Sequence, residues 1–222
     1  FALPDDMSLA NIFASVEGLV TGVIGEGVAA SPNPTLGWVG SLSEIESIYG
    51  YWVKMEGAGV LEGSGQATNP ETVYDLHYGA NLVSFYAIPA NDAISNMMSS
   101  ISESVTQVVG AGVSATHFGD GNWSGSLTTI VPTSGYWVIT YSDEFIFNYS
   151  EPSEGMARLV NEDSQERPIE VSFNQSTEQA FYFIRNIDGA DIGDWIVAFN
   201  DNIIVGSRQW NGSIIDVPAM GF

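Results

Sequence analysis

Apolar residues recur at helical spacing near the start of the chain and again 85 residues later. The spacing i, i+3, i+4, i+7 and i+11 predicts an amphipathic helix within residues 5–20. Asp5, Asp6 and Ser8 precede this stripe, where they provide an N-cap and favourable first-turn charge. The first stripe comprises Leu9, Ile12, Phe13, Val16 and Val20. The second comprises Ile94, Met97, Met98, Ile101 and Val105.

Short stretches of strand character follow each predicted helix. A Gly-punctuated extended run, a Trp-led strand and a Tyr-led strand occur in the same order both times. In the first copy they cover Val20–Ala30, Trp38–Leu42 and Tyr51–Met55. In the second copy they cover Val105–Ala115, Trp123–Leu127 and Tyr136–Tyr141. We therefore predict two small α+β modules, each with one helix on antiparallel strands.

The two stretches are interpreted as a tandem duplication. Gly50-Tyr51-Trp52-Val53 recurs as Gly135-Tyr136-Trp137-Val138, and one ungapped register extends back to the pair Ala2 and Ala87. About 20 of roughly 53 aligned pairs are identical, which is far above chance. The duplication retains apolar and glycine positions but no carboxylate, because Glu26 aligns with Ala111 and Glu44 with Thr129. This favours a scaffold over a catalytic site.

The rest of the chain has a different pattern. Residues 56–72 and 150–155 are predicted to be exposed connectors. Val73–His77 and Asn81–Phe85 are predicted to form a hairpin around Tyr78-Gly79-Ala80. Further strands are predicted at Ile169–Phe173, Ala180–Ile184, Asp194–Asn200, Ile203–Gln209 and Ile214–Val217. The third and fourth of these would join in a tight hairpin across Asp201-Asn202, within an all-β unit that resembles half of a sandwich.

The predicted fold class is α+β to mainly β, in three units. Residues 1–70 form the first module, 71–150 the second, and 151–222 a β-sandwich-like unit. The second module is preceded by the strand-like Asn81–Phe85, whereas nothing precedes the first copy at Phe1. We therefore expect the matching first strand to lie upstream of residue 1, in a longer polypeptide.

Composition narrows the classes of partner. Of 222 residues, 27 are acidic and only five are basic, giving a net charge of −22. This charge repels phosphate backbones and anionic lipid, so we expect no nucleic-acid partner and no membrane insertion. The absence of cysteine excludes disulfides and thiolate metal sites. A hydrophobic content of 45% with few charged residues is typical of an extracellular or virion-surface β-rich protein.

Several motifs resemble those of known modules. The segment Asn81–Phe85, followed by Trp123-x-Gly125-x-Leu127 and Gly135–Val138, resembles tandem repeat modules of secreted bacterial proteins. Closely similar modules occur in virion and fibre proteins of marine bacteriophages. The resemblance implies an extracellular or virion-surface role and carries no known catalytic residue.

The third unit resembles a β-sandwich module that recurs at the ends of secreted bacterial surface proteins. The resemblance lies in Gly193–Phe199, Val205-Gly206 and Trp210-Asn211-Gly212. That module continues for another strand or two past the stretch matching Asp216–Pro218. We therefore expect the last unit to be incomplete within residues 151–222.

A calcium-binding loop is one candidate functional site in the sequence. Asp188, Asp191 and Asp194 are spaced regularly around glycines, as the oxygen ligands of a calcium loop are. The loop lacks the D-x-[DN]-x-[DN]-G pattern with a terminal Glu. The same aspartates and glycines are also expected in an ordinary turn that leads into a strand. His77 and His117 are not shared between the copies, so no zinc site is expected.

The tryptophans are candidate contacts for a carbohydrate ligand. Trp38, Trp52, Trp123 and Trp137 recur between small or apolar neighbours, which favours positions in the core over a sugar-binding platform. Trp195 and Trp210 are single aromatics near a predicted hairpin and are retained as candidate glycan contacts.

The leading hypothesis is a non-enzymatic structural or adhesive segment of a larger extracellular or phage virion protein, such as a fibre, tail or capsid-surface component. It would act through module–module and strand-edge contacts, with copies of itself or neighbouring assembly proteins as partners. The alternative is a carbohydrate-binding module that recognises cell-surface glycans. A glycoside hydrolase fragment would need two facing carboxylates in a cleft, and no sequence motif indicates them.

Overall fold

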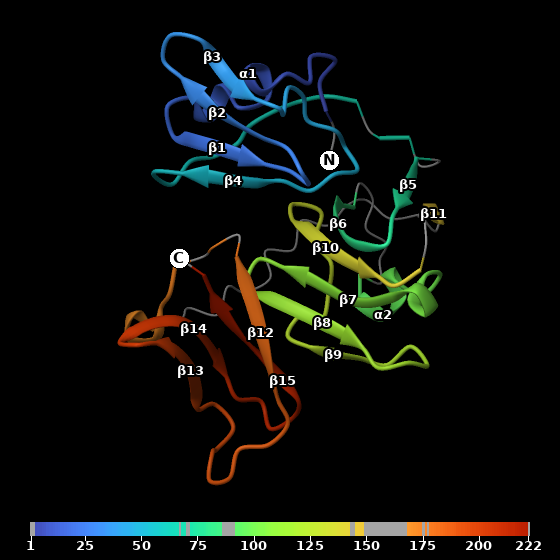
Figure 1. Cartoon of the computed structure of the whole chain (residues 1–222), viewed down its shortest axis with the longest axis vertical. Coiled ribbons are helices and arrows are strands. Elements are labelled where there is room, and N and C mark those ends of the chain that lie inside the picture. The colour runs from blue at the N-terminus through green and yellow to red at the C-terminus, as the bar shows by residue number, and fades with distance from the viewer. Residues whose placement is uncertain are drawn as a thin grey trace.

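Three β-rich units follow one another along the chain, coloured blue, green to yellow, and orange to red in Figure 1. The structure, a computed structural model, describes residues 3–66, 68–69, 72–85, 92–142, 145–148, 168–174, 176 and 178–221. Unit 1 lies within residues 3–66, unit 2 within 72–148 and unit 3 within 168–221. All strand pairs are antiparallel, which confirms the mainly β class. Among the described helices, none has the length and apolar content needed to cross a bilayer.

Unit 1 is a four-stranded sheet with a short helical turn against it. Its elements are α1 (Leu9–Ile12), the 3₁₀ turn η1 (Ala14–Val16), β1 (Val20–Ile24), β2 (Ala29–Asn33), β3 (Gly37–Gly40) and β4 (Trp52–Met55). The strand order is β3-β2-β1-β4, so β4 forms one edge of the sheet.

Unit 2 has a five-stranded sheet in the order β6-β10-β7-β8-β9 and a separate pair, β11-β5. Its elements are β5 (Val73–Leu76), β6 (Gly79–Ser84), α2 (Ile94–Met97), η2 (Ser102–Ser104), β7 (Val105–Gly110), β8 (Val113–His117), β9 (Trp123–Gly125), β10 (Gly135–Thr140) and β11 (Phe145–Asn148). The order β9-β8-β7-β10 matches β3-β2-β1-β4 of unit 1, and β1 and β7 begin 85 residues apart, at Val20 and Val105. Unit 2 has one additional strand in the sheet, β6, next to β10.

Unit 3 contains two strand pairs, β12 with β15 and β13 with β14. Its elements are η3 (Ile169–Val171), β12 (Gln179–Ile184), β13 (Trp195–Asn200), β14 (Ile203–Gln209) and β15 (Ile215–Met220). The hairpin across Asp201-Asn202 is confirmed, with Asp201 in the left-handed region at φ 53°. The strand predicted at Ile169–Phe173 is wrong, because this segment forms a 3₁₀ turn.

The predicted helix over residues 5–20 is wrong in length although its stripe is buried. The hydroxyl of Ser8 accepts a hydrogen bond from the N–H of Asn11, so Ser8 is the N-cap, as predicted. The helix then tightens into a 3₁₀ turn and the chain enters β1 after Gly18, which has φ 82°. A 3₁₀ turn also places residues i and i+3 on one side, so the apolar stripe does not require a continuous helix.

The predicted hairpin of Val73–His77 with Asn81–Phe85 does not form. Both segments are strands, but β5 pairs with β11 and β6 pairs with β10. Between them the side chain of Asn81 accepts from the N–H of His77 (2.9 Å) and donates to its carbonyl (2.9 Å). These bonds stabilise a turn that separates the two strands. The connector predicted at 150–155 lies outside the described residues.

The four-stranded sheet of unit 1 and the five-stranded sheet of unit 2 each bury one face in a separate core. In unit 1 the core contains Leu9, Ile12, Phe13, Val16, Val20, Val23, Ala30, Leu42 and Ile45. The larger core of unit 2 also receives residues from β5 and β6, namely Tyr74, Leu76 and Val83, together with the adjoining Phe85.

Candidate binding sites at the unit junctions

The outer edge of β4 is an open strand edge. Strand β4 pairs with β1 on one side, and no described strand pairs with it on the other. Its counterpart β10 pairs on both sides, with β7 and with β6. An unpaired edge presents free N–H and C=O groups that can bind an added strand.

A groove of about 690 Å³ runs beside this edge and is called the β4 groove here. It is bounded by α1, by the start of β4, by connector residues 61–64 and by the unit 2 turn at 132–135. Its apolar lining includes Ile12, Phe13, Ile45, Tyr51 and Val53. Val53 is 39% exposed.

Of these five residues, Ile12, Phe13 and Ile45 are buried in unit 1, whereas Tyr51 is half-buried and Val53 is exposed; in unit 2 all five counterparts are buried. The residues 85 positions later are Met97, Met98, Ile130, Tyr136 and Val138, and none is more than 3% exposed. They belong to the core that contains Val83 of β6 and Phe85 beyond it, and the rings of Phe85 and Tyr136 lie 6.1 Å apart. The β4 groove therefore occupies the place that β6 and the residue after it fill in unit 2.

Unit 1 covers the outer edge of β6. The N–H of Gly50 donates to the carbonyl of Leu82 (3.0 Å), and the N–H of Ser84 donates to the carbonyl of Ile48 (2.8 Å). The backbones of Gly50 and Gly135 also meet here, since a Cβ on Gly50 would lie 3.1 Å from Cα of Gly135. The paired glycines of the two repeated tetrapeptides thus allow the units to approach closely.

A carboxylate joins the same two units. One oxygen of Glu26 accepts from the N–H of Leu82 (2.7 Å), and the other lies 2.5 Å from Nε2 of His77. Both residues line a cavity of about 460 Å³ that also contains Glu44, Glu46 and Asp75. Burial of its phenol raises the pKa of Tyr49, and the nearby carboxylates of Glu46, Glu26 and Asp75 raise it further. The two oxygens of Glu26 are therefore already engaged in holding units 1 and 2 together.

Units 2 and 3 meet through the fully buried carboxylate of Asp216 on β15. It accepts hydrogen bonds from the N–H of Ser126 (2.5 Å), the hydroxyl of Ser126 (2.8 Å) and the hydroxyl of Ser114 (3.1 Å). Arg208 lies 3.6 Å from it and donates to the carbonyl of Gly112 (2.5 Å). This network links β14 and β15 to β8 and the end of β9.

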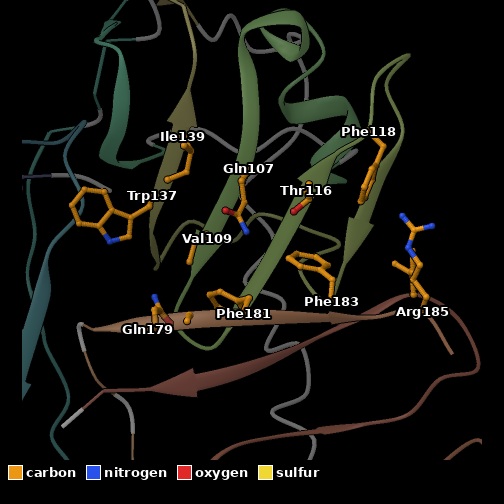
Figure 2. A pocket seen from close by; sticks show the side chains of 12 residues that line it. Gln107, Val109, Thr116, Phe118, Trp137, Ile139, Gln179, Phe181, Phe183 and Arg185 are labelled. Atoms are coloured by element: carbon orange, nitrogen blue, oxygen red, sulfur yellow. The ribbon is translucent and has the colours of Figure 1, made fainter. Parts of the chain in front are cut away.

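A second groove of about 620 Å³, called the aromatic cleft here, lies between the outer face of the unit 2 sheet and β12. Figure 2 shows Phe181 and Phe183 pointing from β12 toward this sheet face, which presents Trp137, Gln107 and Thr116. The remaining lining residues are Val109, Phe118, Ile139, Gln179, Ala180, Arg185 and Ile214. None of the 12 is acidic.

The tryptophans divide into two groups, and the prediction that all four repeated ones lie in the core is wrong for two. Trp38 and Trp123 pack against the cores of units 1 and 2. Trp52 and Trp137 lie on the outer sheet faces, half-buried, because Tyr51 and Tyr136 take the inward positions and side chains alternate along a strand. Trp137 lines the aromatic cleft.

The two predicted glycan contacts lie away from both grooves. Trp210 is buried at 5% exposure, and its backbone bonds to Gly193 (2.8 Å) and Asp194 (2.7 Å). Its ring therefore has no open face for a sugar. Trp195 is half-buried at the start of β13 and lines neither groove.

The three aspartates of the predicted calcium loop are exposed and serve the turn that leads to β13. The carboxylate of Asp194 accepts from the N–H of Asp191 (2.9 Å), and that of Asp188 accepts from the amide of Asn186 (3.0 Å). Within the described ranges, no group of three or more acidic or histidine side chains is placed to hold a metal ion. Calcium binding stays a prediction.

The ring of His117 stacks on that of Trp123, with their centroids 4.9 Å apart, and its Nε2 accepts a hydrogen bond from the N–H of Gly121 (3.2 Å).

Sequence reasoning missed the aromatic cleft and the Asp216 network. The alternation of Phe181, Tyr182 and Phe183 on β12 was a usable signal, since it places two rings on one face. Asp216 carried no such signal in a stretch of otherwise apolar residues.

Comparisons of this chain with known proteins find no similar protein. No protein-family model, no curated protein and no solved structure matches this chain.

Proposed function

We propose that the protein is a non-enzymatic structural or adhesive segment of an extracellular or virion-surface assembly, in which unit 1 accepts an extended strand from a neighbouring polypeptide. Units 1 and 2 share the repeated segment, and within the described residues the sheet of unit 2 has a fifth strand, β6, beside β10, while the sheet of unit 1 has no strand on the outer side of β4. The incoming strand lies along β4 and directs its apolar side chains into the β4 groove.

One observation carries this proposal: Tyr51 and Val53 line the β4 groove without being buried, whereas their unit 2 counterparts Tyr136 and Val138 are at most 3% exposed. Val53 is 39% exposed and its counterpart Val138 is 1% exposed. Burying the difference is worth about 1 kcal/mol for this side chain alone, at about 25 cal/mol per Å². The backbone hydrogen bonds of a new ladder add to this, as in other cases of strand addition.

The chemistry of the partner follows from β6. Asn81-Leu82-Val83-Ser84-Phe85 pairs with β10 and buries Val83 and Phe85 against the helix and sheet. A strand suited to β4 therefore runs antiparallel to β4 and has apolar residues two positions apart, as Val83 and Phe85 are, that face the groove. The high negative charge of the rest of the surface favours solubility of the protein while no strand is bound at β4.

The test is binding of a synthetic peptide with the sequence of residues 79–85 to the whole 222-residue chain, measured by isothermal titration calorimetry and thermal unfolding. We expect binding that raises the melting temperature, and a substitution of Val53→Asp that weakens it at least tenfold because a carboxylate enters the apolar groove. Val39→Asp is the matched control, since Val39 is 46% exposed on β3 at the opposite edge of the same sheet.

The source of the strand is resolved by sedimentation velocity across a concentration series. Self-association that Val53→Asp abolishes and Val39→Asp does not identifies a second copy as the partner. A monomer that binds the peptide indicates a different polypeptide. The strand proposal fails if the peptide neither binds nor stabilises the chain and the chain remains monomeric.

A further inference from the structure

We propose that the aromatic cleft between units 2 and 3 is a binding site for a neutral oligosaccharide. This inference is independent of strand addition at β4, because the aromatic cleft and the β4 groove share no lining residue. It also differs from the glycan site expected around Trp195 and Trp210, neither of which lines the cleft.

The first argument is the placement of aromatic rings on both walls. Phe181 and Phe183 extend from β12, while Trp137 lies on β10 and Phe118 follows β8 (Figure 2). Phe118 is 55% exposed. The negative face of an aromatic ring attracts the C–H groups on the flat face of a sugar, and rings on two walls can hold successive sugar units.

The second argument is the polar groups between the rings. The side chains of Gln107 and Thr116 face the cleft and make no hydrogen bond within the described part of the chain. An apolar tail or ring placed here would remove them from water without replacing their bonds, at a cost in affinity. Sugar hydroxyls both donate and accept, so they match an amide and a hydroxyl in either orientation.

The third argument is charge. The cleft is lined by no acidic residue in a chain that has 27 of them, and its one charged group is Arg185. Arg185 is exposed and forms no ion pair with any described residue, so its N–H groups are free to donate to sugar oxygens. The net charge of −22 repels a polyanionic glycan such as a polyuronate, which leaves a neutral chain as the ligand.

The cleft is also held open by a defined contact. The side-chain amide of Gln179 donates to the carbonyl of Gly110 (3.3 Å) and accepts from the N–H of Gly112 (3.5 Å), which attaches the start of β12 to unit 2. Together with the Asp216 network, this contact sets the spacing of the two walls before ligand arrives. A preformed cleft avoids the ordering cost of assembling a site on binding.

The test uses the whole chain on a glycan array that carries neutral oligosaccharides and polyuronates, followed by titration calorimetry with the strongest binder. Neutral β-linked and α-linked glucan hexasaccharides are included as soluble probes, with an alginate hexasaccharide as the polyanionic probe. We expect a neutral glycan to bind and alginate not to bind.

Two exposed aromatics form a matched pair of variants. Phe118→Ala removes a ring that is 55% exposed inside the cleft, and Tyr182→Ala removes one that is 61% exposed on the opposite face of β12. Loss of one stacking ring should weaken binding about tenfold in the first variant and leave it unchanged in the second. Arg185→Gln should weaken binding several-fold without loss of folding, checked by circular dichroism.

Three outcomes would overturn the proposal. One is no binding of any neutral glycan, and another is preferential binding of alginate. The third is equal binding by the Phe118→Ala and Tyr182→Ala variants. Because Val53→Asp leaves the cleft untouched, its effect on peptide binding is read separately and failure of one proposal does not imply failure of the other.

Discussion

The buried carboxylate of Asp216 should be a large single contribution to the attachment of unit 3. It is fully buried and accepts three hydrogen bonds from unit 2, two from Ser126 and one from Ser114. Substitution of Asp216→Asn retains the size of the side chain and removes its charge. The guanidinium of Arg208, 3.6 Å away, then remains beside two serines without a counter-charge.

The expected cost can be worked from these contacts. Breaking a buried ion pair by removing one partner costs about 3–5 kcal/mol. Arg208 keeps its bonds to the backbone carbonyls of Asp216 (3.1 Å) and Gly112 (2.5 Å), so the loss should fall near the lower end, about 3 kcal/mol. A double variant that adds Arg208→Gln should recover part of this loss, since the uncompensated charge is then absent.

The assay is urea unfolding followed by far-ultraviolet circular dichroism, with hydrogen exchange of the β8 and β15 amides as a local readout. Asp188→Asn is the control, because Asp188 is exposed and bonds only to a neighbouring side chain in the described structure. We expect faster exchange on both sides of the junction in Asp216→Asn alone. A loss of stability below about 1 kcal/mol would refute the reasoning that this charge pair holds the two units together.

Two further predictions concern the junction of units 1 and 2 and the alkaline limit of stability. Gly50→Ala should destabilise the protein by about 1–3 kcal/mol in urea unfolding, because its Cβ would lie 2.9 Å from the carbonyl oxygen of Val83, whereas Gly63→Ala has nothing within 4 Å and should be neutral. Burial raises the pKa of Tyr136 above the ordinary value of about 10, so the folded state holds this proton more tightly than the unfolded state. The stabilisation is complete below pH 10 and is lost as pH rises through the raised pKa, and an alkaline unfolding titration should show a shallower loss for Tyr136→Phe. Equal alkaline profiles for the two proteins would contradict this assignment.

Local patterns in the sequence were enough to predict most strands. Alternation and turn residues placed β10, β13 and β14 within one or two residues of their observed bounds. The stripe from Leu9 to Val20 correctly predicted a buried face, but it overestimated the helix because a 3₁₀ turn presents the same spacing. Burial of a stripe depends on periodicity, whereas helix length depends on where the backbone hydrogen bonds change pattern.

Partner choice between strands was not readable from the sequence. β5 and β6 are adjacent in the chain and looked like a hairpin, yet each pairs with a strand more than 50 residues away. The face that Trp137 occupies was equally hidden, because alternation fixes that Tyr136 and Trp137 point oppositely but not which of them points inward. That choice depends on where the helix packs.

The sequence by itself determined the β-rich class, the repeated tetrapeptide and the excess of acidic charge. Only the tertiary structure decided that unit 1 has an open edge beside an apolar groove, and that Phe181 and Phe183 face the outer side of the unit 2 sheet across a cleft without carboxylates. The physical reason is the distance along the chain over which each effect acts. Periodicity and turn chemistry act over a few neighbouring residues, while an open edge and a two-walled cleft exist only after segments distant in the chain have packed together.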